Sequence, residues 1–215
     1  MKIAISTRVI IEKSYNEYRD ALSWEWTDYL SKLDKNITTY IIPNNLEMAK
    51  RLMCEVSFDA LILSNGNDIG SLPERDGVES YLLDESFKKN IKVLGVCRGH
   101  QYINYHFSKK MPNEVNDRTK HVAVEHVVNL EDSFAHFFEK NDLTVNSYHN
   151  FAIKREDLSE EFIPAAFSED NELEAYYHRT KDCLCVLWHP ERKNTSQVDT
   201  DKLILSFLKE GITWR

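Results

Sequence analysis

Apolar residues follow two spacings in the first half of the chain. Short apolar runs predict strands at residues 2–7, 38–43, 59–64 and 91–96. Between these runs, apolar residues recur every three or four positions and predict helices at residues 18–33, 46–56, 78–90 and about 99–107. Residues 64–77 are rich in turn-forming residues and predict a loop. Strands that alternate with helices of this length predict a mostly parallel sheet with helices on both faces.

The second half of the chain has a different pattern. Its apolar runs predict five strands, at residues 121–130, 142–147, 162–168, 173–178 and 183–188. A short helix is predicted at residues 133–138, and a final helix at residues 196–211 ends at Gly211. No repeat, linker or low-complexity tract divides the chain. We therefore predict one α/β domain of three layers over residues 1–215.

The net charge of the chain bears on which functions are plausible. Its 215 residues include 35 acidic and 27 basic ones, which gives a formal net charge of −8. This balance argues against non-specific nucleic-acid binding, which needs a dense cationic surface. The first ten residues lack the long apolar region of a signal peptide, and no apolar stretch approaches the length of a membrane span. We expect a cytoplasmic protein without nucleic-acid or membrane partners.

The four cysteines fit a reducing compartment. Cys183 and Cys185 lie two positions apart in a predicted strand, so their side chains should share one face. No group of histidines and cysteines has the spacing of a zinc site, so we expect no structural zinc.

Cys97 is the first candidate for chemistry. It ends the most apolar predicted strand, and Gly95 and Gly99 flank it in the stretch KVLGVCRGHQYIN. A sharp turn from strand to helix exposes a nucleophile at the edge of the sheet and requires small neighbours. A buried core cysteine is an equal alternative on this stretch alone. A nucleophile also needs a base and a group that orients the base.

The stretch VLWHPER supplies both groups. His189 and Glu191 follow a predicted strand, and Pro190 forces the chain to turn between them. A neutral imidazole can take the proton of a thiol, and a carboxylate can fix its tautomer. An oxyanion hole would need backbone N–H groups, for which Arg98 and the loop at Gly66 are candidates. Alone, the loop sequence is also that of an ordinary turn.

Together these segments resemble the class I glutamine amidotransferase superfamily, and within it the stand-alone γ-glutamyl hydrolases of the peptidase C26 type. LGVCRGHQYIN resembles the nucleophile turn of the family, WHPER its His-Pro-Glu segment, LSNGNDIG its oxyanion loop and VNSYHN its Asn-Ser-x-His segment. YNEYRDALSWEW is similar to the N-terminal region of these hydrolases. The resemblance spans nearly the whole chain. It departs from the family at Asn65, which replaces a glycine, and at Asn150 and Phe151.

The resemblance implies a flavodoxin-like sheet, a Cys97–His189–Glu191 triad and no metal or organic cofactor. Four further residues match positions that hold the glutamyl group in the family: Gln101, Ser147, Tyr148 and His149.

The sequence looks most similar to hydrolases of γ-glutamyl-CDP-amidate, which serve the phosphoramidate modification of bacterial capsular polysaccharide. A diphosphate leaving group would need cations, for which four residues are candidates: Arg8, Arg118, Lys120 and Arg192. Other γ-glutamyl amines, such as polyamine or folate conjugates, stay open as substrates. So does a glutaminase subunit that passes ammonia to a synthase partner. A non-catalytic binding protein is disfavoured because it needs no nucleophile and base. We expect a small-molecule partner and leave a homodimer open.

Overall fold

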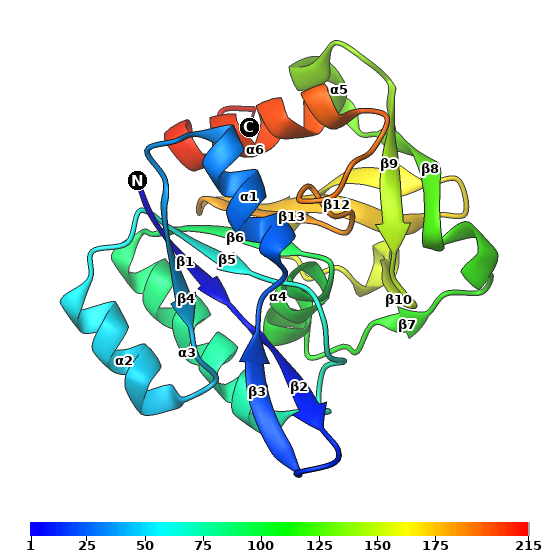
Figure 1. Ribbon diagram of the computed structural model, residues 1–215. Coiled ribbons are helices and arrows are strands. Elements are labelled where there is room, and N and C mark those ends of the chain that lie inside the picture. Colours follow the sequence, from blue (N-terminus) through cyan, green and yellow to red (C-terminus); the bar gives the residue numbers. More distant parts are fainter. Residues whose placement is uncertain (215) are drawn as a thin grey trace.

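A single large sheet forms the centre of the computed structural model, which describes residues 1–214 (Figure 1). One half of this sheet is parallel. Its strands are, in spatial order, β4 (Thr38–Ile42), β1 (Lys2–Ser6), β5 (Ala60–Leu63), β6 (Lys92–Val96) and β13 (Cys183–Val186). Numbered along the chain, this order is 2-1-3-4-5, which is the flavodoxin-like order. The α/β class and the mostly parallel, helix-flanked core of the sheet are as predicted.

Antiparallel strands extend the sheet beyond β13. They are β12 (Glu172–His178), β11 (Phe162–Ser168), β8 (Val122–Leu130) and β9 (Asp142–Tyr148). Two short strands that the sequence pattern did not predict join this half, β10 (Phe151–Lys154) and β7 (Asn113–Glu114). Short 3-10 helices lie at Arg118–Lys120 and Arg155–Asp157.

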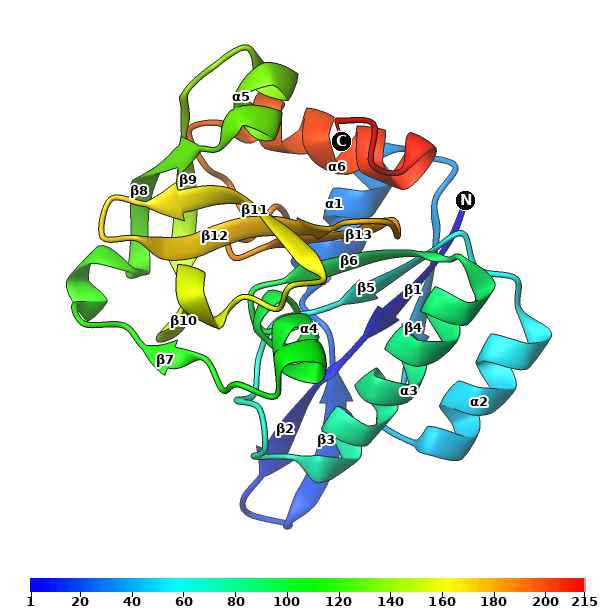
Figure 2. The same ribbon diagram turned by 180° about the vertical axis from the view of Figure 1, so that it is seen from behind.

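Helices cover both faces of the sheet (Figure 2). The face that contains Ile3, Leu94 and Val96 packs against α1 (Trp24–Leu33), α5 (Asp132–Phe138) and α6 (Gln197–Glu210). The face that contains Ala4, Leu61 and Val93 packs against α2 (Leu46–Glu55), α3 (Pro73–Lys89) and α4 (Arg98–Ser108). Alternate residues of each parallel strand therefore enter opposite cores, as the period of two requires. Among the described residues, no helix combines the length and the apolar character that crossing a bilayer requires.

Two sequence predictions were wrong at element boundaries. The predicted helix at residues 18–33 is a helix only from Trp24, because Ser23 caps it by accepting a hydrogen bond from the Glu25 N–H. The residues before it form a hairpin of β2 (Arg8–Glu12) and β3 (Glu17–Ala21), which projects beyond the sheet. The predicted loop at residues 64–77 is also too long. Helix α3 begins within it, at Pro73, because proline is favourable in the first turn.

The cysteine pair on β13 lies as predicted. The Sγ atoms of Cys183 and Cys185 are 3.9 Å apart and both side chains are buried. Strand β13 joins the two halves, since it pairs in parallel with β6 and antiparallel with β12. Groups that follow its end therefore lie between the parallel and the antiparallel half.

Candidate active site

Cys97 lies in a strained turn between β6 and α4. Its φ of 53° and ψ of −105° are rare for any residue other than glycine. The turn is held on both sides, because the Cys97 N–H donates to the Val186 carbonyl (3.0 Å) and the Cys97 carbonyl accepts from the Gln101 N–H (3.1 Å). Strain that persists under such restraint is typical of a functional residue.

The two glycines around Cys97 permit close packing. A Cβ on Gly99 would lie 2.0 Å from the Leu63 carbonyl oxygen, and a Cβ on Gly95 would lie 2.6 Å from Cδ1 of Ile103. Neither distance is compatible with van der Waals contact. The predicted reason for these glycines, the close approach of helix and strands around Cys97, is confirmed.

His189 and Glu191 form a buried pair. Nδ1 of His189 lies 2.8 Å from Oε1 of Glu191, so a proton on Nδ1 can be donated to the carboxylate. Asn146 on β9 fixes the backbone of His189 twice, since it accepts from the His189 N–H (2.8 Å) and donates to the His189 carbonyl (2.8 Å). The edge of the Tyr148 ring packs against the imidazole, with 5.5 Å between ring centroids. The imidazole is thus held in one orientation.

Burial alone would lower the pKa of His189. Electrostatic interactions with Cys97 and Glu191, together with the hydrogen bond to Glu191, outweigh burial and raise the pKa of His189 to about 10.

Asn65 makes an unexpected contact with this pair. Its side-chain amide donates to Oε1 of Glu191 (3.2 Å) and lies 3.1 Å from Nδ1 of His189. From the sequence alone, Asn65 is only a departure from the glycine of the family. The next residue keeps its glycine for a steric reason, because Gly66 has a φ of +95° and a Cβ there would lie 2.9 Å from Arg8.

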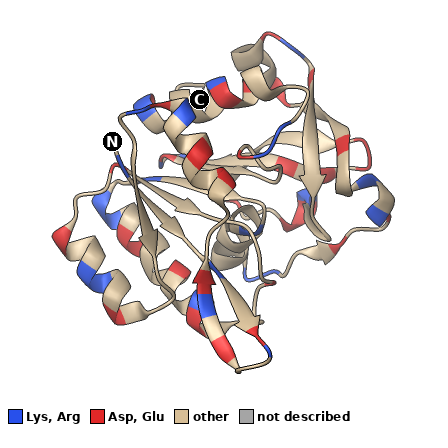
Figure 3. Cartoon of the chain, viewed as in Figure 1, with Lys and Arg blue, Asp and Glu red and all other residues tan. Residues whose placement is uncertain are grey.

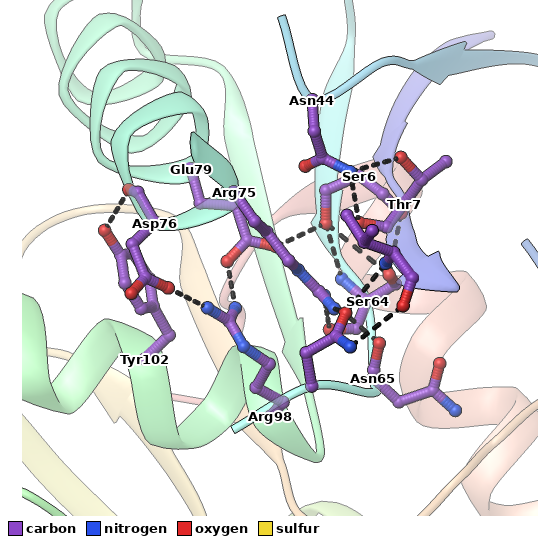
Figure 4. A network of polar contacts seen from close by, with 12 residues as sticks. Ser6, Thr7, Asn44, Ser64, Asn65, Arg75, Asp76, Glu79, Arg98 and Tyr102 are labelled. Carbon is purple, nitrogen blue, oxygen red and sulfur yellow. Dashed lines mark hydrogen bonds and ion pairs between the residues drawn. The ribbon is translucent and has the colours of Figure 1, made fainter. Parts of the chain in front are cut away.

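A buried ionic network supports both backbone segments of the predicted oxyanion hole (Figure 4). The guanidinium of Arg98 donates to Glu79, and Arg75 donates to the same carboxylate (3.1 Å). Arg75 also donates to the carbonyls of Ser64 (3.0 Å) and Asn65 (3.1 Å). One carboxylate therefore links the residue after Cys97 to the loop at Gly66. Sequence reasoning did not find Arg75 and Glu79.

A cavity of about 340 Å³ brings most of the predicted residues together. Its walls include Cys97, His189, Gly66, Arg98, Gln101, Tyr148 and His149. Arg98, as the first residue of α4, has a backbone N–H without an acceptor inside the helix.

Two predicted residues lie behind the cavity wall. Glu191 lies behind His189, and the Ser147 hydroxyl donates to the His121 carbonyl (2.6 Å).

The four candidate cations divide into two groups. Arg8 and Arg192 line the cavity. Arg192 lies over the Tyr148 ring, with its Cζ 4.4 Å from the ring centroid. Arg118 and Lys120 are exposed and do not line it, and Arg118 pairs with Glu114 (3.2 Å).

Comparisons with known proteins fit this geometry. The family model described as peptidase C26 matches residues 42–191, which include Cys97 and His189 and end at Glu191. The γ-glutamyl-CDP-amidate hydrolase of Campylobacter jejuni is 30% identical over 98% of this chain and 100% of its own length. The glutamine-hydrolysing GMP synthase subunit of Thermoplasma acidophilum is 27% identical over 80% of each chain. A crystal structure of a candidate GMP synthase subunit from the same organism superposes with a TM-score of 0.71 at 21% identity, covering 97% of this chain and 94% of the other.

Proposed function

Because the chain belongs to the peptidase C26 family of class I glutamine amidotransferase-like proteins, we propose that it hydrolyses a γ-glutamyl amide through Cys97, His189 and Glu191. The observation that carries this proposal is the buried His189–Glu191 contact of 2.8 Å, with Cys97 and His189 together in the wall of one cavity. A nucleophile, a base and an orienting carboxylate are the parts that acyl transfer needs.

In the proposed reaction, the Cys97 thiolate attacks the side-chain carbonyl carbon of the γ-glutamyl group. The carbonyl oxygen becomes an oxyanion, which accepts hydrogen bonds from the backbone N–H groups at Gly66 and Arg98. The His189 imidazolium gives its proton to the departing nitrogen as the C–N bond breaks, which leaves a γ-glutamyl thioester. His189 then takes a proton from water, and the hydroxide releases glutamate and the thiolate. Gln101 and the backbone of Ser147, Tyr148 and His149 are proposed to hold the glutamyl group.

We further propose γ-glutamyl-CDP-amidate as the substrate. Its hydrolysis would give glutamate and cytidine diphosphoramidate, for modification of capsular polysaccharide. The full-length similarity to the Campylobacter jejuni hydrolase supports this choice. Arg8 supports it independently, since it lines the cavity and has no ion-pair partner among residues 1–214. A guanidinium without a partner is suited to a diphosphate.

The mechanism is tested by replacing the thiol. Cys97→Ala should abolish glutamate release while the far-UV circular dichroism and melting temperature stay close to those of the parent protein. Cys54→Ala is the matched control, because Cys54 is exposed on α2 and does not line the cavity. A folded Cys97→Ala variant with full activity would refute the mechanism.

The substrate is tested by measuring glutamate release from four compounds: γ-glutamyl-CDP-amidate, glutamine, a γ-glutamyl amine and γ-glutamyl polyglutamate. We expect the highest kcat/KM for γ-glutamyl-CDP-amidate. The alternative is a glutaminase component of a synthase, which the similarity to the GMP synthase subunit of Thermoplasma acidophilum supports. Glutamine hydrolysis that appears only when a second protein is added would favour that alternative.

A further inference from the structure

Three histidines and one glutamate meet behind the wall of the active-site cavity. They are His121, His126, His149 and Glu174. His121 follows the 3-10 helix at Arg118–Lys120, His126 is on β8, His149 follows β9, and Glu174 is on β12. One nitrogen or oxygen from each residue lies within 4.8 Å of all the others.

The contacts in this cluster have ion-pair distances without hydrogen-bond geometry. Oε1 of Glu174 lies 3.3 Å from Nε2 of His149 and 3.4 Å from Nε2 of His126. Within the described part of the chain, neither carboxylate oxygen and neither Nε2 atom has a hydrogen-bond partner, although all four atoms are buried. Four ligands placed tetrahedrally at ~2.0–2.2 Å from a zinc ion lie about 3.3–3.6 Å apart, and the two Glu174–histidine distances are close to this spacing.

A carboxylate outside the cluster orients one of the imidazoles. His121 contacts Asp170 through Nε2 (3.0 Å), while its buried Nδ1 has no hydrogen-bond partner among residues 1–214. Metal-bound histidines are typically held by such a carboxylate or carbonyl on the other ring nitrogen.

The charges around the cluster suit a divalent cation. The carboxylates of Glu174 and Asp170 together offset two positive charges when the histidines are neutral.

We propose that His121, His126, His149 and Glu174 bind one zinc ion in a tetrahedral structural site. Three imidazoles and one carboxylate form a nitrogen-rich ligand set that suits zinc better than magnesium or calcium. The ion would tie His149, the residue after Tyr148, to strands β8 and β12, and so fix one wall of the cavity. The site does not depend on the proposed hydrolysis. Its ligands come from segments far apart in the sequence, which explains why residue spacing gave no sign of it.

Metal analysis of the untagged protein tests this proposal. After loading with zinc and removal of the excess, we expect about one zinc ion per chain by inductively coupled plasma mass spectrometry. Glu174→Gln and His126→Ala should lose this ion, and His136→Ala should keep it, because His136 is exposed on α5. Cobalt added to the metal-free parent protein should give the intense visible absorption of tetrahedral coordination, a readout that needs no variant to fold.

Several results would overturn the proposal. A zinc-loaded parent protein without bound metal would do so, as would equal zinc binding by the parent protein and the folded Glu174→Gln variant. Loss of the ion in Cys97→Ala would place it at the proposed nucleophile instead. A chelator should lower the melting temperature of the parent protein and leave that of Glu174→Gln unchanged, and equal shifts in both would contradict the site.

Discussion

At the scale of single residues, the protonation state of His189 is set by the groups around it. Burial on its own would keep the imidazole neutral, but Cys97 and Glu191 make the charged form the stable one. Asn65 donates to the same carboxylate oxygen as the imidazole and so helps to hold Glu191 in place. The proposed chemistry of Cys97 therefore depends on three side chains that are distant from it in the sequence.

The pKa of His189 predicts the alkaline limit of activity. The imidazolium must protonate the departing nitrogen, so kcat/KM should fall as the pH rises through about 10. Glu191→Gln removes one of the two negative neighbours that raise this pKa. The alkaline limb should therefore move to lower pH, and kcat should fall by roughly 10²- to 10⁴-fold. A pH profile of glutamate release measures both effects. The exposed Glu47→Gln is the control, and an unshifted limb in Glu191→Gln would contradict the assignment.

At the scale of elements, helix α4 packs closely against the sheet because Gly95 and Gly99 have no side chains. Because the Leu63 carbonyl occupies the space where a Gly99 side chain would lie, the first turn of α4 can approach β5. This approach places Arg98 beside the loop at Gly66, with both in the wall of one cavity.

Two glycine substitutions should have opposite effects on stability. Gly99→Ala would force the backbone of α4 away from the Leu63 carbonyl of β5 and should lower the free energy of unfolding by about 1–3 kcal/mol. Gly77→Ala is the matched control, since Gly77 lies inside α3 with no atom within 4 Å of an added Cβ. That change should stabilise the protein by roughly 0.5–1 kcal/mol. Urea denaturation measures both, and a neutral Gly99→Ala would contradict the packing argument.

Helix α3 contributes the buried carboxylate that joins α4 to the loop. Burial raises the pKa of Glu79, but Arg75 and Arg98 outweigh burial and hold it below 4.5. The ionised Glu79 carboxylate therefore stabilises the folded state fully above pH 4.5. This stabilisation is lost as the pH falls through the lower pKa that Glu79 has in the folded state.

Glu79→Gln should lower the free energy of unfolding by about 3–5 kcal/mol at neutral pH, because it leaves two buried guanidinium groups without their shared anion. The exposed Lys50–Glu47 pair provides the control, and Glu47→Gln should cost less than about 1 kcal/mol. Chemical denaturation at pH 7 compares the two variants. Equal effects would show that the network adds nothing to stability beyond a surface pair.

At the scale of the whole molecule, the sequence predicted the layers better than the contacts between them. Hydrophobic period and the motifs around Cys97 and His189 are local, so they predicted most of the large sheet and most helices, and they selected two residues that share one cavity wall. Residues 17–21 lie in the exposed hairpin, where the sequence pattern favoured a helix, and the hairpin was missed. The contacts of Asn65, Glu79 and Glu174 form only when distant segments of the chain meet, so no local sequence pattern predicts them.

The cavity lies where the two halves of the sheet meet. Cys97 ends a strand of the parallel half, Tyr148 ends a strand of the antiparallel half, and His189 follows the strand that they share. Acidic and basic residues are interspersed over the ribbon, as along α2 (Figure 3). With a net charge of −8, the protein would attract the proposed anionic substrate through local cations at the cavity rather than through its overall field.

Arg8 is the cation that should distinguish the proposed substrate from glutamine. Arg8→Gln keeps the aliphatic part that packs beside Gly66 but removes the charge. Loss of a charged hydrogen bond of about 1.5–3 kcal/mol predicts a rise in KM of roughly tenfold or more for γ-glutamyl-CDP-amidate. The KM for glutamine, which has no diphosphate, should change little. Arg118→Gln is the matched control, because Arg118 is exposed, pairs with Glu114 and does not line the cavity. Steady-state kinetics with both substrates measures the difference, and a rise in KM that is equal for the two would exclude Arg8 as the group that binds the diphosphate.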